Sequence, residues 1–120
     1  MKTAQFLKFD KSDSQNLALA ALDYTTDFER KFKLEQILIN FSVNVSETIT
    51  ITLDSALGAN YDTVLQEVTL VAEKSLVYRP QGQANFQAGD ELRIQCTNAN
   101  GIGVAYCSLK SSEMWWIKTN

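Results

Sequence analysis

The chain has 120 residues, of which 45% are hydrophobic and 21% charged, with 11 basic and 14 acidic residues. This length suits one domain with its own hydrophobic core, and the composition excludes a chain that is disordered throughout. A net charge of −3, with the short basic group Arg30-Lys31-Phe32-Lys33 flanked by glutamates, excludes the cationic surface of a nucleic-acid-binding protein. No run approaches the roughly 18 apolar residues of a membrane span. We therefore expect neither a nucleic-acid partner nor a membrane partner.

The first 16 residues differ from the rest of the chain. Phe6, Leu7 and Phe9 precede a wholly polar run over residues 10–16, a pattern typical of an arm or long loop ahead of a domain. The start resembles a signal peptide, but charged residues interrupt its apolar part. We expect a protein that is made in a cytoplasm, with an arm at 1–16 whose apolar residues cover the domain or a neighbouring subunit.

Alternating apolar residues from position 17 onward predict β-strands with one buried face. Residues 17–21 begin this alternation, and residues 37–45 place an aliphatic or aromatic side chain at every odd position. Residues 48–54 alternate threonine with isoleucine and leucine, side chains that favour strands. The short connection Ser46-Glu47 predicts a hairpin between these two segments.

Further strands are expected in the middle of the chain. Residues 55–62 contain glycine, asparagine and aspartate and predict a loop. Residues 64–72 and 75–79 predict strands, the second of which ends at Pro80. Turns are expected at 81–83 and 88–90, each around a glycine.

The two cysteines belong to a last predicted hairpin. Leu92, Ile94 and Cys96 alternate on one strand, and a two-residue turn at Gly101-Ile102 would place Cys96 directly opposite Cys107. A disulfide between directly opposed, hydrogen-bonded strand positions is strained. We therefore expect two reduced thiols on the core face.

Catalytic and metal-binding patterns are missing from the sequence. There is no histidine, so the Ser-His and Cys-His arrangements and most zinc sites are excluded. Asp54, Asn60 and Asp62 offer oxygen atoms for calcium, but such residues at strand ends more often form turns. Asp90 and Glu91 follow a glycine and predict a turn that begins a strand. We expect no catalytic residue, no cofactor and no metal.

The spacing of these segments predicts the fold class. Seven or eight short strands, separated by turn signals and without a convincing helix, indicate an all-β, single-domain antiparallel β-sandwich or jelly roll. We divide the chain into an N-terminal arm at 1–16 and a β-sandwich domain at 17–120.

The aromatic residues suggest interaction sites. Trp115 and Trp116 are adjacent, so on a strand one of them covers the core and the other is exposed unless a partner covers it. Together with Phe6, Leu7 and Phe9, they are the predicted partner interface. Tyr61 and Tyr78 lie near loops and support an alternative, in which one of them or a tryptophan stacks on a sugar.

Residues 35–110 resemble the small β-sandwich virion proteins of tailed bacteriophages. The resemblance is carried by TITLDSALGANYD at 50–62, AGDELRI at 88–94 and TNA at 97–99. It covers about two thirds of the chain and leaves out the arm and the tryptophan pair. Its motifs belong to the fold, and it implies no active-site residue.

This resemblance implies a non-enzymatic virion accessory protein, most simply a capsid decoration (cement) protein. Such proteins form trimers or other cyclic homo-oligomers on the particle, where the major capsid protein or other virion proteins are the partners. The expected location is the virion, after synthesis in the host cytoplasm. The alternative is a glycan- or receptor-binding β-sandwich module of a phage tail or a lectin-like protein.

Overall fold

The computed structural model describes the backbone of residues 2–28, 30–80 and 85–118, and the side chains of residues 10–28, 30–80 and 86–113. Within these ranges the protein consists of nine β-strands and one short 3₁₀ turn, η1 (Ala59–Tyr61). None of the described segments is a helix with the length and apolar character needed to cross a membrane.

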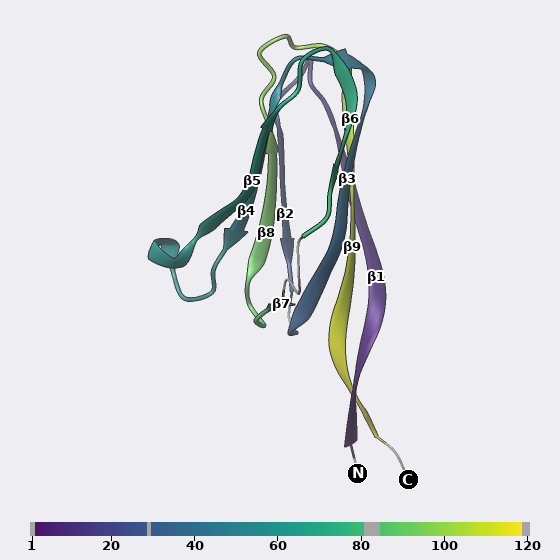
Figure 1. Cartoon of the computed structure of the whole chain (residues 1–120), viewed down its shortest axis with the longest axis vertical. Coiled ribbons are helices and arrows are strands. Elements are labelled where there is room, and N and C mark those ends of the chain that lie inside the picture. Colours follow the sequence, from purple (N-terminus) through teal and green to yellow (C-terminus); the bar gives the residue numbers. More distant parts are fainter. Residues whose placement is uncertain (1, 29, 81–84, 119–120) are drawn as a thin grey trace.

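The strands form two antiparallel sheets that face each other (Figure 1). The first sheet has the order β1 (Lys2–Asn16), β9 (Val104–Lys118), β3 (Phe32–Val45) and β6 (Glu73–Tyr78), with the short β7 (Asn85–Phe86) also paired to β3. The second sheet has the order β2 (Leu22–Asp27), β8 (Glu91–Cys96), β4 (Thr48–Asp54) and β5 (Thr63–Thr69).

The pairing of the strands is nested. β4 pairs with the next strand, β5, and strands further out along the chain pair in turn: β3 with β6, β2 with β8, and β1 with β9. A long antiparallel hairpin rolled up in this way is a jelly roll, in which most consecutive strands lie in opposite sheets. The predicted fold class, an all-β antiparallel sandwich or jelly roll, is confirmed.

The core lies between the two sheets and follows the alternation of the sequence. Along most of their length β3, β4, β8 and β9 direct every second residue inward, as expected for pleated strands with one solvent-facing side. In β3 the alternation shifts between Leu34 and Gln36, where the pairing with β9 also shifts. The aliphatic side chains that are fully inaccessible are Leu17, Ile37, Ile39, Ile49, Ile51, Leu92, Ile94, Ala105 and Leu109.

An aromatic stack closes the core at one end. The rings of Phe28 and Phe32 are stacked with centroids 3.4 Å apart, and Phe86 packs on Phe32 at 5.0 Å. Lys11 of β1 lies 4.2 Å above the Phe28 ring and donates a hydrogen bond to the Asp27 carbonyl oxygen at 2.8 Å. This lysine therefore joins the edge of the first sheet to the end of β2 in the second.

Both predicted hairpins that depended on Ser46-Glu47 and on Gly101-Ile102 are wrong. β3 and β4 lie in different sheets, so Ser46-Glu47 is a corner at which the chain crosses the core. β8 and β9 likewise lie in different sheets, and Cys96 pairs with Leu22 and Ile49. Local turn signals cannot distinguish a hairpin from a sheet-to-sheet corner, because both require the same tight reversal.

The expected state of the cysteines is confirmed although their expected register is not. Cys96 and Cys107 are each 2% exposed and carry free thiols. Cys107 pairs with Asp13 on β1 and Ile39 on β3, so the two thiols enter the core from opposite sheets.

The start of the chain also differs from the expectation. Residues 17–21 form a turn, with Leu17 buried and Leu19 80% exposed. The polar run at 10–16 is strand and not loop, because β1 pairs with β9 along its whole length. The loop at 55–62, the end of a strand before Pro80 and the turn at 88–90 are as expected. The strand expected at 64–72 is present as β5 but ends at Thr69. The expected turn at 81–83 lies outside the described residues.

Candidate functional site

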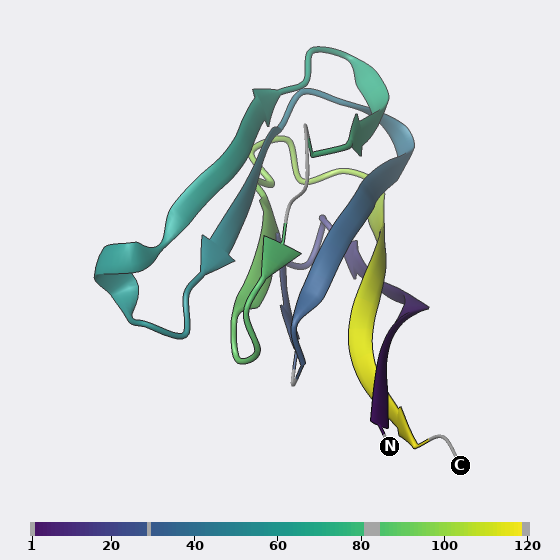
Figure 2. The same ribbon diagram turned by 60° about the horizontal axis from the view of Figure 1, so that its bottom comes forward.

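A two-stranded ribbon extends from the body of the sandwich. β3 accompanies β9 only from Ala105 to Glu113, and in the described backbone residues 114–118 pair with residues 2–6 of β1 alone. Figure 2 shows this ribbon leaving the body, with both chain ends at its tip. The molecule measures 56 × 30 × 26 Å, and its radius of gyration of 15.9 Å exceeds the roughly 14 Å of a compact chain of this size.

The ribbon brings together residues that the sequence analysis selected separately. Phe6 pairs with Met114, while Trp115 and Trp116 pair with Gln5 and Ala4. Leu7 and Phe9 lie nearer the body, opposite Glu113 and Ser111. The backbone thus places all five predicted interface residues on the two strands β1 and β9. Their side chains are outside the described set, so their role as an interface stays a prediction.

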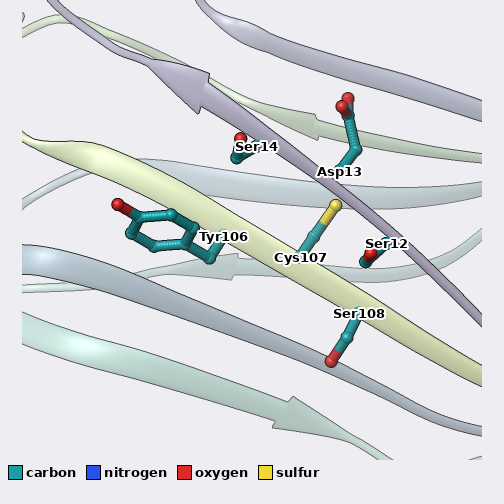
Figure 3. A pocket seen from close by; sticks show the side chains of 6 residues that line it. All are labelled: Ser12, Asp13, Ser14, Tyr106, Cys107 and Ser108. Carbon is teal, nitrogen blue, oxygen red and sulfur yellow. The ribbon is translucent and has the colours of Figure 1, made fainter.

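A shallow hollow of about 460 Å³ lies beside the same two strands, closer to the middle of the body (Figure 3). Its lining residues are Ser12, Asp13, Ser14, Tyr106, Cys107 and Ser108. Burial raises the pKa of the Cys107 thiol to about 11, and the nearby Asp13 carboxylate acts in the same direction. A thiol that stays protonated is a poor nucleophile, so the hollow does not resemble the site of a cysteine enzyme.

The outer face of the second sheet is acidic. Arg93 of β8 forms a bidentate ion pair with Asp23 of β2, with N–O distances of 2.7 and 2.8 Å. The Arg93 guanidinium lowers the pKa of Asp23 through this hydrogen bond. Four other charged residues lie on the outward side of this sheet, and all of them are acidic: Asp27, Asp54, Glu67 and Glu91. Such a face does not suit a polyanion.

Asp62, a calcium candidate in the sequence, and Asp90 both hold turns. Asp62 accepts a hydrogen bond from the Ser55 backbone N–H at 2.8 Å. Asp90, 6% exposed, accepts from the N–H groups of Ala56 at 2.9 Å and Gln87 at 3.0 Å. The interpretation of both as turn-forming residues is confirmed. Among the side chains that are described, no three His, Cys, Asp or Glu residues are grouped as a metal site would require.

Glu47 is a buried charged residue whose importance the sequence analysis missed. It is 2% exposed at the corner between β3 and β4, and its carboxylate accepts from the Thr97 hydroxyl and the Ala99 N–H, both at 2.9 Å, and from the Asn100 N–H at 3.1 Å. A charged side chain so well satisfied has a structural role, because it fixes the loop between β8 and β9. The only signal in the sequence was a lone glutamate between two aliphatic strands.

The tyrosines of the alternative prediction do not share an element. Tyr61 ends η1 ahead of β5 and is 61% exposed. Tyr78 ends β6 in the other sheet, where it is half-buried and lines a hollow of about 420 Å³ with Leu65 and Arg79. The tyrosines thus lie on segments of different sheets.

Comparison with known proteins identifies structural similarity and no sequence family. No family model matches the chain, and no curated protein matches it by sequence. A chain from the capsid structure of the Helicobacter pylori bacteriophage KHP30 is similar in structure, with a TM-score of 0.61 and 8% identity; the match covers 99% of this chain and 100% of that one. At this identity the likeness concerns the fold.

Two further structures are less similar. PirA has a TM-score of 0.45 at 10% identity, with 92% of this chain and 93% of that chain covered. The nucleoplasmin-like N-terminal domain of Drosophila FKBP39 has a TM-score of 0.44 at 14% identity, with 98% and 94% covered. At these scores neither structure informs the function of this chain.

Proposed function

We propose that the chain is a non-enzymatic structural protein of a virus, and more narrowly a bacteriophage capsid decoration protein. In this role it binds the major capsid protein or other virion proteins as a homo-oligomer, with a trimer favoured, and stabilises the assembled shell by mass action. The observation that carries the proposal is the two-stranded ribbon formed by residues 2–6 and 114–118, which projects from a jelly roll.

A projecting ribbon of this kind needs a partner. Two strands without a third strand or a packed face are marginally stable in water. Five residues of each strand lie past the end of β3, and the sequence of the ribbon includes Phe6, Trp115, Trp116 and Ile117. Large aromatic residues are enriched in protein interfaces, where a partner removes them from water. A second subunit or a shell protein would supply the missing cover.

The structural likeness to a chain of a phage capsid supports the same proposal. That chain and this one are similar along their full lengths, and the jelly roll is a common architecture of viral capsid domains. Because a fold hosts many functions, this support is weaker than the support from the ribbon.

The test is the binding of the purified protein to capsid particles of the virus that encodes it. Wild-type protein should co-sediment with particles at a saturating stoichiometry, whereas Trp115→Ala/Trp116→Ala should bind at least about tenfold more weakly, since interface tryptophans are frequent hot spots. The matched control is Tyr61→Ala, which removes an exposed aromatic residue away from the ribbon.

Two results would contradict the proposal. If mass spectrometry of purified virions does not detect the chain, the virion role is wrong. If the double tryptophan variant saturates particles as the wild type does, the tryptophan pair of the ribbon is not the contact. Binding of the isolated protein to a glycan array, abolished by Tyr61→Ala, would instead support the alternative of a glycan-binding module.

A further inference from the structure

The end of the sandwich opposite the termini is a neutral surface. Four connecting segments meet there, at the top of Figure 1: residues 17–21, 42–46 (which include the last residues of β3), 70–72 and 97–103. They contain no Asp, Glu, Lys or Arg, whereas 21% of the whole chain is charged. We call this set of residues the neutral end.

The neutral end exposes large aliphatic side chains. The exposed fractions are 80% for Leu19, 71% for Val71, 50% for Ile102 and 40% for Val43. One exposed aliphatic residue needs no explanation, but four on adjoining connections without charges resemble the core of a protein interface, from which charged residues are depleted. Glu73 and Lys74, at the start of β6, provide a polar rim.

Hydrogen bonds hold the four connections together as one surface. The Leu17 N–H donates to the Gly103 carbonyl oxygen at 2.9 Å, and the Val104 N–H donates to the Ser42 hydroxyl at 2.8 Å. The Leu70 N–H donates to the Glu47 carbonyl oxygen at 2.8 Å. The buried Glu47 carboxylate fixes residues 97–100 from below. A surface organised in this way loses little conformational freedom when a partner binds.

We infer that the neutral end is the surface through which two copies of this chain associate end to end. The inference extends the proposed function and rests on it for the expectation that copies of the chain associate. A contact between two identical surfaces places each residue near its own counterpart, so any charge close to the symmetry axis would face a like charge. Apart from the buried, hydrogen-bonded carboxylate of Glu47, the neutral end places no charge at such a contact. The acidic outer face of the second sheet would place Asp27, Asp54, Glu67 and Glu91 there.

The end of the molecule is large enough for a stable end-to-end contact. The cross-section normal to the long axis is at most 30 × 26 Å, or about 780 Å². A standard interface buries roughly 800 Å² on each partner. A contact that covers the whole end on both copies therefore approaches this scale. The same geometry leaves the ribbon at the opposite end free for another partner.

The experiment is sedimentation velocity of the full chain over a range of concentrations, with Leu19→Asp and Ile102→Asp as test variants. Both side chains are at least half exposed, so the aspartates should leave the fold intact, which circular dichroism checks. Leu57→Asp is the matched control, because Leu57 is 76% exposed on the loop before β5, away from the neutral end.

We expect the wild type and Leu57→Asp to self-associate with the same dissociation constant, and each test variant to weaken association at least about tenfold. The inference is overturned if the wild type stays monomeric up to millimolar concentration, if both test variants associate as the wild type does, or if Leu57→Asp weakens association equally. Each test variant should still co-sediment with capsid particles. Sedimentation velocity therefore tests the end-to-end contact, and co-sedimentation with particles tests the proposed virion role.

Discussion

At the scale of single residues, substitution of the buried Glu47 has a large predicted effect on stability. Glu47→Ala would leave one hydroxyl and two backbone N–H donors without their acceptor in a nearly inaccessible site. Because each such loss costs roughly 1–3 kcal/mol and the effects overlap, we expect the free energy of unfolding to fall by about 3 kcal/mol in urea titrations. Glu47→Gln keeps one acceptor oxygen and should lose less.

The control for Glu47 is Glu67→Gln, on the exposed side of β5, where a change of less than about 0.5 kcal/mol is expected. If Glu47→Ala proves no more destabilising than this control, the buried carboxylate does not hold the loop between β8 and β9 in the manner described.

The two cysteines predict how stability depends on alkaline pH. Burial raises the pKa of Cys96 to about 12, with a smaller effect of the Glu47 carboxylate, and the pKa of Cys107 to about 11. Because both values lie above the ordinary thiol value of 9.0, the neutral thiols stabilise the fold fully below about pH 9. This stabilisation should be lost progressively as the pH rises towards 11 and 12.

Thermal unfolding from pH 8 to 11 measures this effect. Tyr24 and Tyr78, whose pKa values burial also raises, act in the same direction, so Cys96→Ala/Cys107→Ala is needed as a comparison and should show a shallower decline. At pH 8 a thiol reagent should label the native protein on the order of 100-fold more slowly than the unfolded chain. Rapid native labelling of both thiols would contradict the described burial.

At the scale of elements, Gly103 determines how the chain turns from β8 into β9. Its φ is +79°, and a Cβ atom there would lie 2.7 Å from Val43 Cγ2 and 3.1 Å from Ser42 Oγ. Gly58, with φ +117°, has no atom within 4 Å of such a Cβ. Gly58→Ala should therefore cost about 1 kcal/mol of unfolding free energy for the backbone alone.

Gly103→Ala should cost roughly 2–4 kcal/mol, since it adds a steric conflict to the same backbone penalty. Adding Val43→Ala should recover part of this loss, because it removes the side chain that the new Cβ atom would contact. The cost of the positive φ angle would remain. Equal costs for the two glycine variants would show that Val43 moves aside freely.

Truncations of β1 should affect stability differently depending on how much of the strand they remove. Deletion of residues 1–6 removes backbone that pairs only with residues 114–118 among the described strands, so the body should keep its melting temperature within a few degrees. Deletion of residues 1–16 removes the whole of β1 and exposes the edge of β9, which should cause a large loss of stability or aggregation.

Circular dichroism melts compare the two truncations. A large loss on deletion of residues 1–6 would mean that the ribbon supports the body, whereas a negligible loss on deletion of 1–16 would mean that residues 1–16 behave as the dispensable arm that the sequence suggested.

At the scale of the whole molecule, the nested pairing joins the first strand to the last and places eight strands around one core. Loop-closure entropy opposes pairings between distant segments, so they form only when the core between both sheets is buried at the same time. The two proposed interaction surfaces also lie at opposite ends of the molecule. The ribbon that carries both termini is the proposed contact with the virion, and the neutral end is the proposed contact between two copies of the chain.

The sequence by itself determined most of the residues that face the core and most of the strands. Val43, which is exposed, and residues 10–21 are exceptions. The alternation in residues 37–45, 48–54 and 92–96 follows directly from the two-residue period of a strand, and it placed Cys96 and Cys107 inside without knowledge of their partners. Turn residues also placed the loop at 55–62 and the turn at 88–90 correctly, because these conformations depend on the local backbone.

Only the tertiary structure decided which strands are neighbours. It separated the segments on either side of Ser46-Glu47 and of Gly101-Ile102 into opposite sheets, and it joined residues 2–6 to residues 114–118. It also gathered four neutral connections, far apart in the chain, at one end of the molecule. The reason is physical: alternation specifies a buried face, but the partner of each strand depends on how all the buried faces can be packed together at once.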